Sequence, residues 1–250
     1  MAYYIFDESN FNSFNPANLV FEEGKKDIGT YKVSYFNLKY KNADGSACII
    51  KVKTPVLTTP FGANKNQFGK MNITCNVPKS PLHEFITKLQ EAVKNYICDN
   101  IKTFNKSSTK SKLSQTEFDI LSTAFDILKH KEDSKYDDTI VFDVTGEYDQ
   151  KNLKLFDNTK NHIEGIVYDD ESDEKYIGKE IPSQSQIRVV FTINSICMYG
   201  ETKARKFTFK KRPVQILVVE KATNNDVCEF SDEEVSEYSE EEEDNANWDD

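Results

Sequence analysis

The residue types best suited to bind a ligand form one short run, from Lys203 to Arg212. Six of its ten residues are Lys or Arg, and Phe207 and Phe209 lie two positions apart within it. Residues two apart on a strand share a face, so both rings could form a platform on which bases stack while the flanking cations contact phosphates. The competing interpretation buries both rings in the core and leaves the cations on a solvated face. The run by itself favours neither interpretation.

Other residues could extend the same surface. Tyr199 precedes the turn before the run and would add a third ring, while two lysines and a phenylalanine near the loop at 54–62 could line the same groove. A further cationic set, Lys106, Lys110 and Lys112, is more typical of a solvated linker. The predicted nucleic-acid contacts are therefore Lys203, Arg205, Lys206, Lys210, Lys211 and Arg212 on phosphates, Phe207, Phe209 and Tyr199 on bases, and Lys51, Lys53 and Phe61 in supporting positions.

Signals for catalysis or metal binding are nearly absent. His83, His130 and His162 are isolated in sequence, with no HxH or HExxH spacing, so neither a metal site nor a general base is predicted. The nine glycines form no phosphate-binding loop, and the acidic stretch at 169–174 lacks the order of a calcium loop. No apolar run reaches the roughly 18 residues of a membrane span. We therefore expect a non-enzymatic protein with no cofactor, no metal and no membrane partner.

The charge of the chain is divided unevenly. The net charge is −10, yet no Lys or Arg follows Lys221, and thirteen of the 42 acids do. The body to Lys221 thus carries 32 cations against 42 − 13 = 29 acids, a net +3. The segment 222–250 has almost nothing to bury and repels itself, so it is predicted to be a disordered tail.

This acidic tail ends near the only tryptophan of the chain, Trp248. A large ring in so polar a segment suggests an anchor for a partner or for the body's own groove, although an acidic tail can also serve solubility alone. The predicted partner-binding residues of the tail are Glu240, Glu241, Glu242, Glu243, Asp244 and Trp248.

The elements that position these residues are predicted to be mainly strands. Residues 1–30 show little periodicity and are expected to be irregular. Ser80-Pro81 is a helix start, and Ser114 to Glu117 is a capping box that opens a second helix carrying Phe118, Leu121, Phe125 and Leu128. Alternating apolar residues predict strands at 31–40, 47–52, 71–77, 139–144, 186–199 and 205–220.

The order of three strands, a helical insertion and further strands fits an OB-like Greek-key β-barrel. The predicted fold class is mainly β with helical additions. One body covers residues 1–221, with its helical insertion at about 80–130, and the disordered tail covers 222–250.

The body, the basic-aromatic final hairpin and the acidic tail with an aromatic near its end resemble the single-stranded-DNA-binding proteins of T7-like phages. The segment 53–62 and the closing strands at 187–219 also resemble the single-stranded-DNA-binding proteins of large nucleocytoplasmic DNA viruses. The resemblance implies that the tail mimics DNA, competes for the groove and recruits replication proteins. The chain departs from the phage pattern by ending Trp248-Asp249-Asp250 rather than in the aromatic residue itself.

The predicted function is sequence-independent binding of single-stranded DNA in replication, recombination or repair. Five scattered cysteines without a CxxC pair indicate a reducing compartment, so we expect an intracellular protein of the cytoplasm or nucleus. Two alternatives stay open. In a histone-chaperone-like protein the acidic tail would be the active part and bind basic partners. A sliding-clamp-like factor would need two similar halves, which the sequence does not show.

Overall fold

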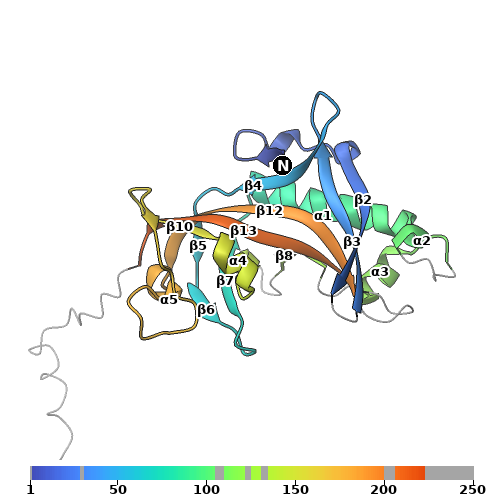
Figure 1. The fold of residues 1–250 in the computed structure, drawn as a ribbon. Helices are drawn as coiled ribbons and strands as arrows, with labels where there is room; N and C mark the ends of the chain where they lie inside the picture. The colour runs from blue at the N-terminus through green and yellow to red at the C-terminus, as the bar shows by residue number, and fades with distance from the viewer. Residues whose placement is uncertain are drawn as a thin grey trace, which may run out of the picture.

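The structure is a computed structural model of the 250-residue chain. It describes residues 2–28, 31–104, 110–121, 125–130, 135–199 and 206–222 (Figure 1). The acidic segment from 223 onward and the segment 200–205 lie outside the described residues. The expectations about the tail, Lys203 and Arg205 therefore stay sequence predictions.

The larger sheet is organised around two long antiparallel strands, β12 (Ser185–Tyr199) and β13 (Lys206–Glu220), which cross the molecule in Figure 1. Along its other edge β12 pairs in turn with three strands that precede it in the chain. The remaining members of this nine-stranded sheet are β1 (Tyr3–Phe6), β2 (Leu19–Ile28), β3 (Tyr31–Lys41), β4 (Ala47–Lys53), β5 (Leu57–Thr59), β10 (Lys154–Phe156) and β11 (His162–Ile163).

The prediction that residues 1–30 are irregular is wrong, because β1 and β2 lie within them. β1 pairs in parallel with β4, more than forty residues away, so its strand character depends on a partner that local periodicity does not reveal.

A second, four-stranded sheet has the order β6-β7-β9-β8. In β7 (Met71–Val77) every second residue is buried, as the alternation of apolar residues predicts. Leu128, predicted on the second helix, lies instead in a short edge strand. The other strands of this sheet are β6 (Ala63–Lys65), β8 (Leu128–Lys129) and β9 (Asp138–Asp143).

The helices between residues 81 and 121 cover the inner, core-facing side of the larger sheet. Ser80 caps α1 (Pro81–Asp99) by accepting a hydrogen bond from the His83 backbone at 3.3 Å, and Pro81 occupies the first turn. The predicted capping box is also present, because Ser114 Oγ accepts from the Glu117 backbone at 3.2 Å while Glu117 accepts from that of Ser114 at 2.9 Å. The other helices are α2 (Ile101–Phe104), α3 (Gln115–Leu121), α4 (Glu147–Asn152), α5 (Ile177–Glu180) and the 3-10 turns at Phe11–Ser13 and Pro16–Asn18.

An aromatic-rich core joins the helices to this inner face. Phe85 of α1 lies 4.6 Å from Phe6 of β1 between ring centroids, and Phe104 of α2 lies 4.1 Å from Phe36 of β3. The expected mainly β body with helical additions is confirmed, although in the described part of the chain seven strands, β1 to β7, precede α1 where the sequence predicted three. No helix among the described residues is long and apolar enough to cross a membrane.

Candidate nucleic-acid interface

The described part of the basic-aromatic run, Lys206 to Arg212, lies on β13, where the alternation of the strand divides it between two faces. Phe207 is 0% exposed and Phe209 is 6% exposed, and both belong to the core. The Phe207 ring stacks on Phe118 of α3, with centroids 5.6 Å apart and planes at 19°, while Phe209 lies 4.7 Å from Phe125. The prediction that these two rings stack on bases is therefore wrong: their faces are taken by protein side chains.

Lys211 shares the inward-facing side of the strand. It pairs directly across from Ile193, which is fully buried, and residues directly opposite on paired strands lie on the same face. Burial, with a smaller contribution from the charge of Lys129, lowers the pKa of Lys211 to about 8. The prediction that Lys211 contacts phosphate beside Arg212 is thus corrected, because the two side chains leave the sheet on opposite sides.

Lys210 and Arg212 remain on the outer face. They pair with Ser195 and Thr192 of β12, and Thr192 lines the groove on this face. The side chains of Lys206 and Tyr199 lie outside the described set, so their predicted contacts stay untested. Of the run's three cations with described side chains, two therefore lie on the outer face.

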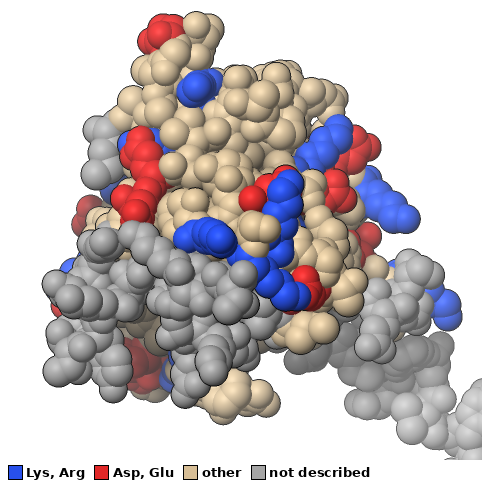
Figure 2. Space-filling view, turned by 90° about the vertical axis from the view of Figure 1, so that its right-hand side faces the viewer, with Lys and Arg blue, Asp and Glu red and all other residues tan. Residues whose placement is uncertain are grey.

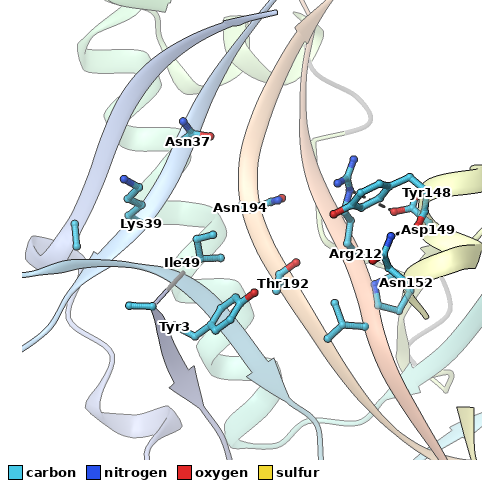
Figure 3. A pocket seen from close by; sticks show the side chains of 14 residues that line it. Tyr3, Asn37, Lys39, Ile49, Tyr148, Asp149, Asn152, Thr192, Asn194 and Arg212 are labelled. Atoms are coloured by element: carbon cyan, nitrogen blue, oxygen red, sulfur yellow. Dashed lines mark hydrogen bonds and ion pairs between the residues drawn. The ribbon is translucent and has the colours of Figure 1, made fainter. Parts of the chain in front are cut away.

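This outer face contains a groove with a volume of about 710 Å³. β1, β3 and β4 form one side, α4 forms the other, and β12 and β13 lie between them (Figure 3). The principal lining side chains are Tyr3, Asn37, Lys39, Ile49, Tyr148, Asp149, Asn152, Thr192, Asn194 and Arg212.

One wall combines an exposed ring with a fixed cation. The guanidinium carbon of Arg212 lies 4.7 Å from the centroid of Tyr148, whose side chain is 62% exposed. Arg212 Nε also lies 3.3 Å from Asp149 Oδ1, next to Tyr148 on α4. A cation over an aromatic face is attracted by the ring's quadrupole, so these contacts hold both groups at the rim of the groove.

The opposite wall of the groove also combines an exposed aromatic ring with a cation. Lys51 Nζ of β4 lies 3.6 Å from the centroid of Tyr3 of β1, whose side chain is 42% exposed. Lys53 follows on the same face of β4 and is exposed. Lys39 also reaches the groove and pairs with Glu22 at 2.6 Å. Lys51 thus lies beside the Tyr3 wall of the groove. The supporting role of Lys51 and Lys53 in binding stays a prediction.

Sequence reasoning missed Tyr3 and Tyr148 as candidate stacking residues. Tyr3 lies in the segment expected to be irregular, and Tyr148 lies on a helix that the sequence analysis did not assign. The two residues are 145 positions apart, and only the pairing of β1 with β4 and the packing of α4 beside β13 bring them to one groove. The one available signal was their residue type, which is too common to select them.

The other predicted positions lie apart from the groove. Phe61 is exposed on the loop before β6 and is not among the lining residues. In the linker before α3, Lys110 is paired with Glu117, and Lys112 Nζ lies 2.8 Å from Asp99. Figure 2 shows one end of the molecule, where Lys and Arg side chains likewise lie beside Asp and Glu side chains.

Two of the histidines expected to be isolated meet on one carboxylate. Asp138 Oδ2 lies 2.7 Å from His83 Nε2 and 2.8 Å from His130 Nδ1. Burial raises the pKa of Asp138, but the hydrogen bonds from both imidazoles and the charge of His130 outweigh it and hold that pKa below its ordinary value. Among the residues that the structure describes, no group of three or more His, Cys, Asp or Glu side chains could hold a metal ion.

Comparison with known proteins gives a structural likeness only. No protein-family model matches the sequence, and no curated protein matches it. The chain is similar to the solved single-stranded DNA-binding protein of bacteriophage Enc34, with 10% identity and a TM-score of 0.44 over 86% of this chain and 98% of that one. It is also similar to gp2.5, a single-stranded DNA binding protein encoded by bacteriophage T7, with 15% identity and a TM-score of 0.42 over 78% and 98%. Both solved structures are phage single-stranded DNA-binding proteins, the group named by the resemblance in the sequence.

Proposed function

We propose that this chain binds single-stranded DNA in the groove between Tyr3 and Tyr148. The observation that carries the proposal is the pair of exposed rings on opposite walls, each held against a cation, Lys51 on one side and Arg212 on the other. Aromatic rings stack with bases of any sequence, and neighbouring cations contact the phosphates between them.

The arrangement favours a single strand over a duplex. A base can stack on a side chain only when its face is free, and in a duplex the faces are covered by neighbouring bases. Arg212 supplies a charged donor within the groove, and Lys51 lies against the Tyr3 ring of the opposite wall. Lys210 and Lys53 extend the cationic surface along β13 and β4. Asp149 and Glu22 partly offset this charge, so stacking must supply a substantial part of the affinity.

The test compares ring removal inside and outside the groove. Anisotropy of a labelled mixed-sequence single strand should show that Tyr3→Ala and Tyr148→Ala each weaken binding about 5- to 150-fold, corresponding to the roughly 1–3 kcal/mol of a stacked base. The matched control is Tyr136→Ala, because Tyr136 is 68% exposed and lies outside the groove. Equal affinities for all four proteins, or tighter binding of duplex than of single strand, would refute the proposal.

The wider role proposed for the chain rests on charge. Body 1–221 would coat single strands during replication, recombination or repair, while tail 222–250 competes with DNA for the groove and recruits replication proteins. The support is the contrast between a body of net +3 and a tail with thirteen acids.

A further inference from the structure

The floor of the groove contains a buried polar atom without a partner. Asn194 Oδ1 is shielded from water and accepts no hydrogen bond from the described residues. Its side chain lies between the two tyrosine walls (Figure 3). A shielded acceptor that stays unpaired destabilises the fold, so such atoms are rare in folded proteins.

The backbone shows how Asn194 reaches this position. Ile193 pairs with Lys211 and Ser195 pairs with Lys210, so Asn194 is an extra residue in β12 opposite β13. The bulge lets both Ile193 and Ile196, three residues apart, stay fully buried while Asn194 turns outward. Bulges commonly re-aim a side chain beside a functional site.

The same residue marks a change of partner along β12. As far as Ile193 the strand pairs with β4, and from Ser195 it pairs with β3. Asn194 therefore lies where β3 and β4 diverge, and it is paired with no residue of β3, β4 or β13. This location explains both the unpaired oxygen and its place in the groove.

We infer that Asn194 is a specificity-determining residue that reads the edge of a nucleobase held between Tyr3 and Tyr148, and that the groove prefers bases with an exocyclic amino group. The inference rests on the proposed function and adds a base preference to it. An amino group donates to the carbonyl oxygen of the amide, and the broad torsion at the end of the Asn side chain lets that oxygen turn toward the ligand. A base that presents only a carbonyl at that position leaves the oxygen unpaired.

Oligo-dC and oligo-dU give the sharpest comparison, because both are pyrimidines and the ring position that carries the amino group in cytosine carries a carbonyl in uracil. Full-length protein should bind oligo-dC roughly three- to tenfold more tightly than oligo-dU of the same length, the net value of one hydrogen bond. In Asn194→Leu, which has no acceptor and a similar volume, this ratio should fall to about one. The matched control is Asn72→Leu, on β7 of the other sheet, which should keep the ratio.

A second variant distinguishes loss of the acceptor oxygen from loss of the folded state. Asn194→Asp keeps the acceptor oxygens and adds a charge, so it should weaken both oligomers yet keep or widen the preference for oligo-dC. A wild-type ratio at or below one, or a ratio that survives in Asn194→Leu, overturns the inference while leaving the proposed function intact. Failure of the wild-type protein to bind either oligomer instead refutes the proposed function, and the inference with it.

Discussion

The Arg212 guanidinium carbon lies 4.7 Å from the centroid of the Tyr148 ring, so a strand residue and a helix residue share one contact at the rim of the groove. The Asp149 carboxylate, on the same helix as Tyr148, lies 3.3 Å from Arg212 Nε. A lysine could replace the charge of this arginine but not its flat, forked group.

Arg212 should therefore respond differently to two substitutions. Arg212→Lys should lower affinity for single strands while leaving the dependence on salt unchanged, because the charge remains. Arg212→Gln should reduce the slope of log K against log salt by about 0.7, the value of one phosphate contact on a single strand. Lys211→Gln is the neighbouring control: it faces the other side of the sheet, and an equal change in slope there would contradict the assigned faces.

Phe207→Ala and Phe209→Ala should lower stability rather than binding. Both rings are buried against α3 and its neighbouring segment, and removal of a buried Phe costs about 3–5 kcal/mol. Urea unfolding should show this loss, whereas Phe68→Ala, at a position that is 76% exposed, should change stability by less than about 0.5 kcal/mol. Stable variants with weakened DNA binding would place these rings in the interface instead.

Lys211 should make stability rise in mildly alkaline solution. Its folded pKa is about 8 against an ordinary 10.5, so between these values the unfolded chain holds a proton that the folded chain has released. Stability increases with pH wherever the unfolded state binds more protons. Lys211→Met should be more stable than wild type at pH 7, and the difference in unfolding free energy should shrink as the pH approaches 10.5. A difference that is constant from neutral pH upward would contradict the burial of the amine.

Asp138 should contribute stability that acid removes. Its pKa is lower when folded, so the contribution is present above the ordinary value of 3.8 and is lost as the pH falls through the folded value. Asp138→Asn should lower the melting temperature at pH 7, because two imidazoles lose their shared carboxylate. Below pH 3.8 the two melting temperatures should converge. An equal difference at both pH values would indicate that the carboxylate charge has no role.

Removal of residues 222–250 should raise affinity for single strands. Thirteen tethered acids compete with phosphates for the cations of the body, at an effective concentration on the order of millimolar. Salt should reduce the difference between the two proteins, since the Debye length is only ~8 Å at physiological ionic strength. Trp248, the sole tryptophan, should shift its emission to the red when DNA displaces the tail. Unchanged affinity at low salt together with silent fluorescence would favour the histone-chaperone-like alternative.

Local sequence determined the elements wherever the physical cause is local. Ser80 followed by Pro81 starts α1, because the hydroxyl accepts a backbone hydrogen bond and proline fits the first turn. The alternation from Met71 to Val77 fixes a strand with one buried face. The division of charge at Lys221 is likewise a property of composition and needs no tertiary structure.

Tertiary structure decided which side of each strand is buried. Alternation shows that Phe207 and Phe209 share a face, but only the packing of Phe118 and Phe125 shows that this face is buried. The groove combines Tyr3, Asn194 and Tyr148 from three distant parts of the chain, and its floor depends on a bulge at the point where β12 exchanges one partner strand for another. Such features arise from non-local pairing, whose energy is shared between segments and leaves no periodic trace in either one.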